Sequence, residues 1–520
     1  MLNNIKLYYN NAFKWYQKDG YYCIGSIFFD NKWYEGYSLL ELIKNQNVSN
    51  LKDFLGKVTG FFAFVINDFD KTIICSDLLR TFPVFYSLNN GGVQISDNII
   101  DFKSSFDEES VQELVTLSYV TNDKTIYHDV RQLENATIIT IDSNYRIKKE
   151  KYYEFKNEAN GKSLDYDRYI RVLDNVFKRT INYLNKRTVV IPLSGGQDSR
   201  LIAYYLKKMN YPNIITYTYG NKNSEEVLVS KKVAQYLDLK WYFVPYKKKS
   251  MKKKYNNKES RTKIFNYFGR GYSAPHLQEL EAIDYLLKTN KINTDCIIMP
   301  GFTLDFIAGN HLNETLLKDH VTINEVRDEI YKNNYNFKMG NYNFDNKLAL
   351  KFNITNFDNR ELSNVEACNL FEKFDFEERQ TKFITNAVRT YDYYGLKWYL
   401  PFWDKEMIDF WKFVSLQSRY KRSLFIDFTK RMYNDLMKYA PIATEKKTKK
   451  HQGINRILFN LVRPIYLYYN DKLNYYYYFK FGSYLHKVLK YRTLSYDRFV
   501  ALDYIDFMKN DKVGDDLNGI

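Results

Sequence analysis

Short apolar segments separated by polar turns dominate the first 155 residues. Connections such as NDFDK and LNNGG between these segments are typical of hairpins. The pattern predicts an antiparallel, β-rich domain over 1–155 with a few helices. The clearest predicted strands are GFFAFVIND (60–68), KTIICSD (71–77), PVFYSL (83–88), GVQIS (92–96) and ATIITID (136–142).

Strands alternate with helices from about residue 165 onward. RTVVIPL (187–193) has the pattern of a buried strand, and SRLIAYYLKKM (199–209) has helical periodicity. Such alternation predicts a parallel sheet, followed by a mostly helical stretch over 361–440. Further predicted elements are strand IITYTYG (214–220), helix SEEVLVSKKVAQYLDL (224–239), and strands WYFVPY (241–246) and DCIIMPG (295–301).

The segment 441–520 is basic and aromatic. It opens with EKKTKKHQG (445–453) and includes NYYYYFKF (474–481). We expect it to form a helical extension that covers the second domain. Contact of this tract with a membrane surface is the alternative.

Composition narrows the functional classes. The 520 residues carry a net charge of +16, but the Lys-rich bias runs through every segment, so a nucleic-acid partner is not favoured. No apolar run is long enough to span a membrane, and the N-terminal residues lack the features of a secretory signal. The four cysteines lie far apart without a CxxC pair, which predicts a cytoplasmic protein without a cysteine-based zinc or redox site.

The segment SGGQDS (194–199) stands between a predicted strand and a predicted helix. Gly195 and Gly196 would let phosphates approach the backbone, and the N–H groups at the start of the helix suit pyrophosphate. Ser194 and Ser199 could add hydroxyl contacts, and Asp198 could bind Mg²⁺. The loop lacks the GK[ST] of a Walker motif. The alternative interpretation is a serine–glycine turn with an aspartate helix cap and no ligand.

With this loop the chain resembles the asparagine synthetase family, whose synthetase domain belongs to the ATP pyrophosphatases with an SGGxDS loop. The resemblance implies that residues 194–199, including Gln197, bind ATP. It also implies that the segment from Thr216 through Tyr217 to Gly220 lines adenine and ribose.

A second loop, MPGFTLDFIAGN (299–310), resembles the family's GxGxDExxxGY motif. Gly301, Asp305 and Gly309 match, while Phe306 replaces an acidic residue. The resemblance implies that Asp305 is the second magnesium ligand, facing Asp198, and that Gly301 contacts the nucleotide. Two carboxylates at the ends of neighbouring parallel strands are expected at a ligand site.

The segment 386–428 resembles the family's PFLD region through Pro401, Phe402 and Asp404. In the family a glutamate stands four residues before this proline, where the present chain has Lys397; a shifted alignment would offer Asp392 instead.

The basic run 446–450 resembles the stretch that carries a catalytic lysine in the family, so Lys449 and Lys450 are candidates, with His451 in the strict position of one alignment. A solvated charged face is the alternative for this run.

The N-terminal domain resembles the glutaminase half of the same family, a class II glutamine amidotransferase. The family's nucleophile is a cysteine at position 2, whereas this chain has Leu2. Cys23 is mid-chain and cannot present a free α-amine. We therefore predict the glutaminase fold without its activity.

The predicted fold class is mixed α/β and α+β. It comprises an Ntn-hydrolase-like sandwich (1–155), an adenine-nucleotide α-hydrolase-like parallel-sheet domain (165–440) and a helical extension (441–520). The resemblance implies an ATP- and Mg²⁺-dependent, AMP-forming amide ligase that uses ammonia or an amine, as in asparagine biosynthesis. A sugar carboxylate or peptide acceptor, a decayed non-catalytic homologue and an RNA-modifying enzyme are the alternatives.

The acceptor pocket is expected between 271–310 and 386–404, with Ser273 and His276 as possible contacts. The expected partners are a small carboxylate substrate and a nitrogen donor. A homodimer is one assembly compatible with this interpretation.

Overall fold

The structure is a computed structural model of the chain. It describes residues 3–46, 48–89, 92–102, 104–158, 165–334, 345–354, 357, 360–433, 463–469, 475–491 and 495–510. All statements below refer to these residues.

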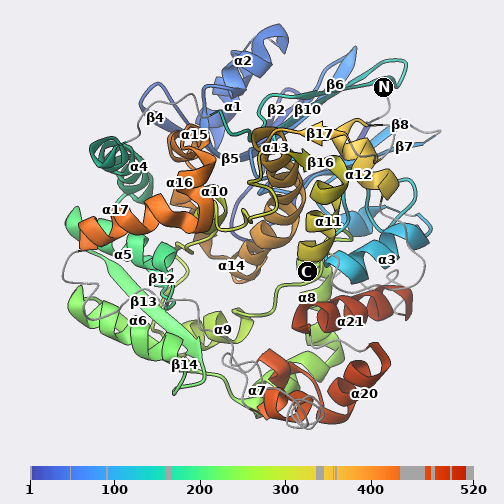
Figure 1. Cartoon of the computed structure of the whole chain (residues 1–520). Coiled ribbons are helices and arrows are strands. Elements are labelled where there is room, and N and C mark those ends of the chain that lie inside the picture. Colours follow the sequence, from blue (N-terminus) through green and yellow to red (C-terminus); the bar gives the residue numbers. More distant parts are fainter. Residues whose placement is uncertain are drawn as a thin grey trace.

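Two β-sheets form the N-terminal domain (Figure 1). The larger sheet is antiparallel and has the order β11-β10-β6-β5-β3-β2, with β4 paired to β3. The smaller has the order β1-β8-β7-β9, and its β1 runs parallel to β8. The strands are β1 (Asn3–Lys6), β2 (Tyr16–Lys18), β3 (Tyr21–Phe29), β4 (Lys32–Glu35), β5 (Thr59–Asn67), β6 (Lys71–Ser76), β7 (Phe85–Asn89), β8 (Gly92–Ser96), β9 (Arg131–Gln132), β10 (Thr137–Asp142) and β11 (Ile147–Lys151).

Strand β5 is buried on both faces, and its side chains alternate between two cores. Phe61, Ala63 and Val65 belong to the main core, which also includes residues of the smaller sheet. Phe62 and Phe64 face a separate core with helices α1 (Tyr37–Lys44) and α2 (Leu51–Leu55). The period of two along a strand therefore makes β5 the middle layer between the smaller sheet and the helices.

A five-stranded parallel sheet forms the centre of the second domain, within the described residues. Its order is β14-β13-β12-β15-β18, and every neighbouring pair is parallel. The strands are β12 (Val189–Pro192), β13 (Ile214–Gly220), β14 (Lys240–Pro245), β15 (Ile297–Ile298) and β18 (Lys397–Trp398). Their carboxyl ends share one edge of the sheet, where α/β proteins bind ligands.

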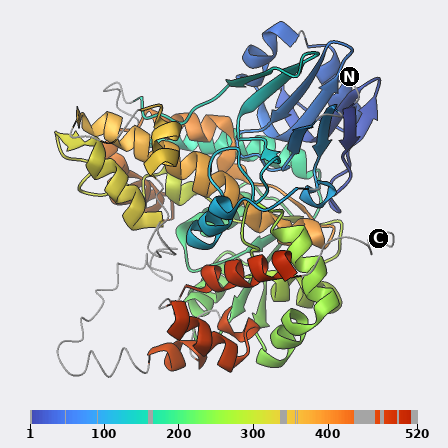
Figure 2. The ribbon, with the colours of Figure 1, turned by 90° about the vertical axis from the view of Figure 1, so that its right-hand side faces the viewer.

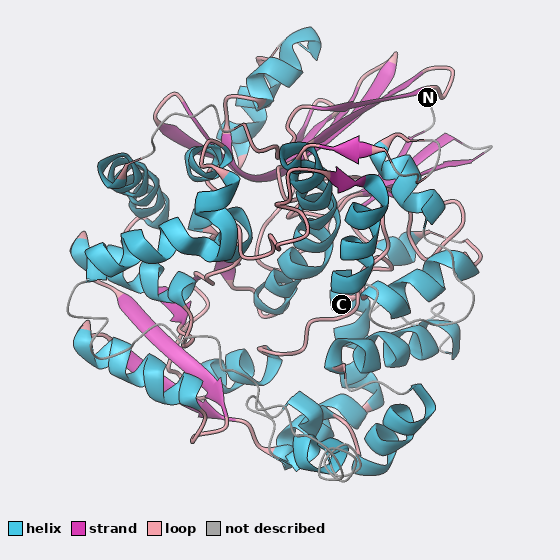
Figure 3. Cartoon of the chain, in the orientation of Figure 1, coloured by secondary structure: helices cyan, strands magenta, loops and turns pink. Residues whose placement is uncertain are grey.

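Helices account for most of the remaining chain (Figure 3). They are α3 (Glu108–Leu117), α4 (Tyr166–Leu184), α5 (Gln197–Lys208), α6 (Glu225–Tyr236), α7 (Lys248–Asn256), α8 (Lys258–Phe268), α9 (Leu280–Lys288), α10 (Leu304–Ile307), α11 (Ile323–Asn334), α12 (Asp345–Phe352), α13 (Asn364–Phe374), the π-helix η3 (Asp375–Ile384), α14 (Arg389–Tyr393), α15 (Lys405–Lys412), α16 (Leu416–Arg419) and α17 (Ser423–Tyr433). A two-stranded ribbon pairs β16 (Val321–Thr322) with β17 (Glu361–Leu362).

The C-terminal segment packs back onto the second domain. Its helices are 463–469, α20 (Phe481–Tyr491) and α21 (Tyr496–Asn510), and Figure 2 shows them beside α7 and α8. The ring of Tyr504 lies 5.7 Å from that of Phe265 in α8, and its hydroxyl accepts a hydrogen bond from the Gly271 backbone. The main core therefore extends into α21.

The fold class expected from the sequence is confirmed: a β-rich N-terminal domain, a parallel-sheet domain and helices. All four cysteines are buried and unpaired. Within the described part of the chain, no helix combines the length and the apolar character needed to cross a membrane.

Candidate nucleotide site

The SGGQDS loop connects β12 to α5, and its serine hydroxyls hold the turn together. The Ser199 hydroxyl accepts a hydrogen bond from the Ser194 backbone N–H at 3.1 Å, and the two serine hydroxyls lie 3.2 Å apart. The Ser194 hydroxyl also accepts from the Gly196 N–H. Gly196 is the N-cap of α5 and has no side chain to take up the first N–H groups of the helix. These groups and the helix dipole can therefore serve an anion.

Gly301 allows the second loop to press against the first. A Cβ at this position would stand 2.5 Å from the Ser199 backbone nitrogen and 2.9 Å from the carbonyl carbon of Asp198. No side chain fits at that distance, so glycine is required by the close approach of the two loops. The contact brings Asp198 of the first loop close to Asp305 of the second loop.

Asp198 and Asp305 meet beside the start of α5. The Asp305 backbone N–H donates to Asp198 Oδ2 at 3.0 Å, and Arg422 Nη2 lies 2.5 Å from Asp198 Oδ1. Burial raises the pKa of Asp198, which Arg422 opposes and Asp305 reinforces. Burial also works against ionised Asp305, yet His311 and Arg422 bring the pKa of Asp305 down to about 2. His311 Nε2 lies 3.7 Å from Asp305 Oδ2, and its Nδ1 contacts the carboxylate of Asp375.

This pair of carboxylates fits a magnesium ion that is shared with phosphates. The described residues contain no group of three or more His, Cys, Asp or Glu side chains arranged to hold a metal ion alone. Two hard oxygen donors next to a helix N-terminus match the preference of Mg²⁺ for a few carboxylates together with phosphate oxygens. Asp198 and Asp305 would hold the ion, and the backbone at the start of α5 would hold the phosphates.

A cavity of about 590 Å³ opens from these carboxylates and has a size typical of small-molecule sites. One part is lined by the loops and strand ends, including Ser194, Gln197, Ser199, Tyr217, Thr218 and Tyr219. Another part is lined by His276, Gln278, Glu279, Arg379, Gln380 and Asp497. A second cavity of about 650 Å³ borders the same loop at Gly195, Gly196 and Gln197.

Most of the sequence-predicted nucleotide contacts line these two cavities. Tyr217 and Gly301 line the first, and Gly195 borders the second. Thr216 is buried instead, and its hydroxyl donates to the Lys240 carbonyl. Thr218 lines the cavity, and it lies two residues nearer the carboxyl end of β13.

The residues expected around the PFLD region make contacts that support the fold. Asp404 caps α15 and forms an ion pair with Arg179 at 2.8 Å. Lys397 lies 3.9 Å from Glu35, and neither it nor Asp392 is among the residues that line the cavity. Asp392 accepts a hydrogen bond from the Trp398 indole at 2.6 Å.

Of the two residues expected to contact the acceptor, one lines the cavity and the other does not. His276 lines the cavity, whereas Ser273 is fully buried and donates to the Ala274 carbonyl. Lys449, Lys450 and His451 lie outside the described residues.

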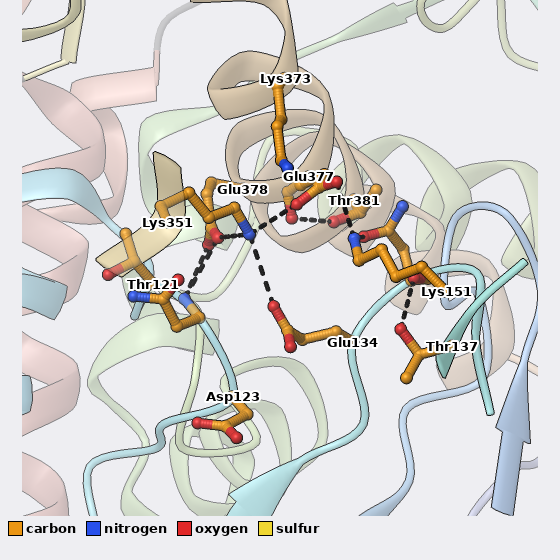
Figure 4. A network of polar contacts seen from close by, with 12 residues as sticks. Thr121, Asp123, Glu134, Thr137, Lys151, Lys351, Lys373, Glu377, Glu378 and Thr381 are labelled. Atoms are coloured by element: carbon orange, nitrogen blue, oxygen red, sulfur yellow. Dashed lines mark hydrogen bonds and ion pairs between the residues drawn. The ribbon is translucent and has the colours of Figure 1, made fainter. Parts of the chain in front are cut away.

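The π-helix η3 carries cavity residues on one side and a buried ion network on the other. Arg379 and Gln380 line the cavity, while Glu377 and Glu378 point toward the N-terminal domain. Figure 4 shows these two glutamates around the ammonium of Lys351, at 2.7 and 2.5 Å. The same ammonium reaches Glu134 of the N-terminal domain at 3.4 Å, and Lys151 reaches Glu377 at 2.8 Å.

Lys382 extends this network at the other end of η3. It is fully buried, lies 2.6 Å from Glu378 and donates to the backbone carbonyls of Val120 and Asn122. Burial lowers the pKa of Lys382 to about 7, although Glu378 opposes the shift. The N-terminal domain is therefore joined by ion pairs and hydrogen bonds to η3, the helix that forms one wall of the cavity.

Comparison with known proteins identifies two segments of the chain. Residues 35–153 match the glutamine amidotransferase domain model, and residues 188–262 match the model of the queuosine biosynthesis protein QueC. The second match contains the SGGQDS loop, α5 and α6. The chain therefore combines a segment similar to a glutamine amidotransferase domain with a segment similar to QueC.

Individual relatives cover only parts of the chain. The 7-cyano-7-deazaguanine synthases of two Staphylococcus epidermidis strains are 36% identical over 64 residues, which is 12% of this chain. The chain spans 29% of the length of these curated relatives.

Solved structures show only distant likeness. One is the NMN synthetase from Francisella tularensis, with 15% identity, a TM-score of 0.20, and coverage of 28% of this chain and 59% of that chain. Another is the glutamine phosphoribosylpyrophosphate amidotransferase from B. subtilis, complexed with ADP and GMP. Its identity is 11%, its TM-score is 0.19, and the match covers 49% of this chain and 74% of that chain.

The sequence did not indicate several residues of the site. Arg422 stands in a short turn with a backbone φ of 59°. His311 approaches Asp305 and is itself contacted by Asp375 of η3. Asp497 comes from α21, in the segment expected to be a cover. Each lies outside the two loop motifs, so only the tertiary fold brings it to the site.

Proposed function

We propose that this chain is an asparagine synthetase-like amide ligase that forms AMP and pyrophosphate from ATP. The observation that carries the proposal is the meeting of Asp198, Asp305 and Arg422 at the open N-terminus of α5. In the proposed reaction an acceptor carboxylate displaces pyrophosphate from the α-phosphorus of ATP. A nitrogen nucleophile then attacks the acyl-adenylate and displaces AMP.

Each part of the site would have a separate role in this reaction. The N–H groups of α5 bind the phosphates, and the guanidinium of Arg422 balances charge at the carboxylate pair. Magnesium, when bound by Asp198 and Asp305, stabilises the negative charge of the departing pyrophosphate. The strand end at Tyr217 to Tyr219 supports the nucleoside, and exclusion of water by the bound substrates would limit hydrolysis of the adenylate. Lys449 and Lys450 remain candidates for additional positive charge.

We infer that the nitrogen comes from ammonia or an amine and not from glutamine. Cys23 is 1% exposed, and burial raises the pKa of its thiol to about 12, so it is not an activated nucleophile. The acceptor could be aspartate, a sugar carboxylate or a peptide carboxylate.

The test is ATP–pyrophosphate exchange over a panel of carboxylic acids, with Asp198→Asn and Asp305→Asn as variants. We expect exchange with at least one acid and a loss of about 100-fold or more in each variant, because each removes one ligand of the charge-stabilising ion. Ammonia, simple amines and glutamine are then supplied in turn as the nitrogen donor.

Isothermal calorimetry with Mg·ATP distinguishes the alternatives. Binding without exchange for any acid would contradict the ligase. Failure to bind Mg·ATP at all would favour a non-catalytic homologue.

A further inference from the structure

One wall of the cavity joins opposite charges from distant parts of the chain. Arg379 comes from η3, and Asp497 comes from the first turn of α21. His276 and Gln278, from the loop before α9, line the same wall. The C-terminal segment is therefore part of the cavity and not only a cover over it.

Gln278 connects Asp497 to His276. Its amide Nε2 donates to Asp497 Oδ1 at 3.5 Å, and its Oε1 lies 3.0 Å from His276 Nδ1. His276 is 6% exposed, and its Nε2 has no hydrogen-bond partner within the described part of the chain. Burial lowers the pKa of His276, so the ring is neutral near pH 7 and adds no full charge to this wall.

The carboxylate of Asp497 has no ion-pair partner within 4.0 Å among the described residues, and Oδ2 accepts no hydrogen bond from them. The adjacent Arg498 directs its guanidinium to the carbonyls of Thr116 and Asn334. Burial raises the pKa of Asp497, and electrostatic interactions with His276, Arg379 and Arg498 oppose this shift. Burying a carboxylate without a close partner has a free-energy cost. A cation entering the cavity would remove that cost.

The wall is linked to the magnesium carboxylates by direct contacts. Arg379 Nη1 lies 3.9 Å from Asp375 Oδ1, and Asp375 contacts His311, which approaches Asp305. A small acceptor can thus place one group at this wall and its reacting carboxylate near the nucleotide.

We propose that Asp497 is a specificity-determining residue that binds a protonated amine on the acceptor. The acceptor class would be a carboxylic acid that also carries a basic nitrogen. This inference rests on the proposed adenylation function. It assigns to α21 a direct part in choosing the substrate.

Pairs of acids that differ only in the amine test the inference in the exchange assay. Suitable pairs are aspartate with succinate, glutamate with glutarate, and 2-amino-2-deoxyglucuronate with glucuronate. We expect the wild-type protein to favour the amine-bearing member of the accepted pair. Asp497→Asn should raise its KM about tenfold or more, because a charge-assisted contact is lost, and leave that of the amine-free member nearly unchanged.

Asp506→Asn is the matched control, because Asp506 is an exposed residue of the same helix. Calorimetric binding of Mg·ATP shows whether Asp497→Asn remains folded, and Asp497→Ser provides a second variant. A wild-type preference for the amine-free acids, or an unchanged amine preference in a folded Asp497 variant, would overturn the inference while leaving adenylation intact. Absence of exchange with every acid would instead contradict the proposed function, and the inference with it.

Discussion

Arg422 places a guanidinium against a carboxylate that we expect to bind magnesium. Asp198 and Asp305 lie side by side, and the guanidinium reduces the cost of holding two negative charges together. A metal ion held by Asp198 and Asp305 would supply this compensation instead. The guanidinium of Arg422 would then be able to contact phosphate oxygens, for which its planar fork is well suited.

We therefore expect Arg422→Gln to weaken Mg·ATP binding about tenfold, since a hydrogen bond between charged groups is lost. Isothermal calorimetry measures the change. Arg431→Gln is the control, because Arg431 lies on α17, the helix that follows Arg422, and its side chain is 60% exposed. Equal affinities in the Arg422 variant and the wild type would show that the residue only compensates Asp198.

The sequence alone identified those site residues that belong to a short motif. Ser194 to Ser199 and Gly301 to Asp305 were found because a loop has a fixed spacing of residue types. Arg422 could not be found this way, because its position depends on the turn before α17 and on contacts across the sheet edge.

The two loops act as one element because Gly301 brings their backbones into contact. We expect Gly301→Ala to push the loop 299–310 away from Ser199 of the SGGQDS loop. The free energy of unfolding should fall by about 1–3 kcal/mol. Exchange activity should fall by more than the loss of folded protein explains, since Asp305 moves relative to Asp198. Thermal unfolding and exchange kinetics measure the two effects.

Gly482→Ala provides the contrast, because a Cβ there meets no atom within 4 Å. That variant lies in α20 and should gain up to about 1 kcal/mol of stability, with activity unchanged. Normal activity in Gly301→Ala would show that the loops tolerate separation.

Strong periodicity made the major elements predictable, and weak periodicity hid the others. The strands β5 and β13 and the helices α5 and α6 coincide with the expected segments. The strand β15 lies within the predicted segment 295–301, but β18 was not predicted. It has two residues, so its place in the sheet depends on tertiary pairing. The π-helix η3 could not be expected either, because its hydrogen-bond pattern has no simple sequence signature.

At the scale of the whole molecule, a buried charge network joins the N-terminal domain to the cavity wall. Removing one partner from such a network leaves an uncompensated charge, which costs more than the intact pair contributes. The amidotransferase-like domain can thus be retained as a support for η3 even if it hydrolyses no glutamine.

Lys382 gives this network a pH dependence with a definite sign. Its folded pKa of about 7 is below the unfolded value of about 10.4, so the unfolded chain binds more protons between these limits. This residue therefore makes stability rise with pH by up to about 1.4 kcal/mol per unit above pH 7. In Lys382→Met that contribution is absent, and the stability difference in favour of the wild type should widen from pH 6.5 to 9.

Urea unfolding at several pH values measures the difference. Lys430→Met, at an exposed position of α17, should follow the wild-type curve. Parallel curves for the wild type and Lys382→Met would rule out a titrating Lys382.

The position of Asp497 has a consequence for synthesis of the protein. Both sheets of the N-terminal domain are complete by residue 151, so this domain can fold early on the ribosome. The cavity takes one of its wall residues from α21, which follows the SGGQDS loop by several hundred residues along the chain. A nascent chain can therefore expose this loop long before the cavity wall is finished. Productive binding must wait until α21 has been translated and has folded.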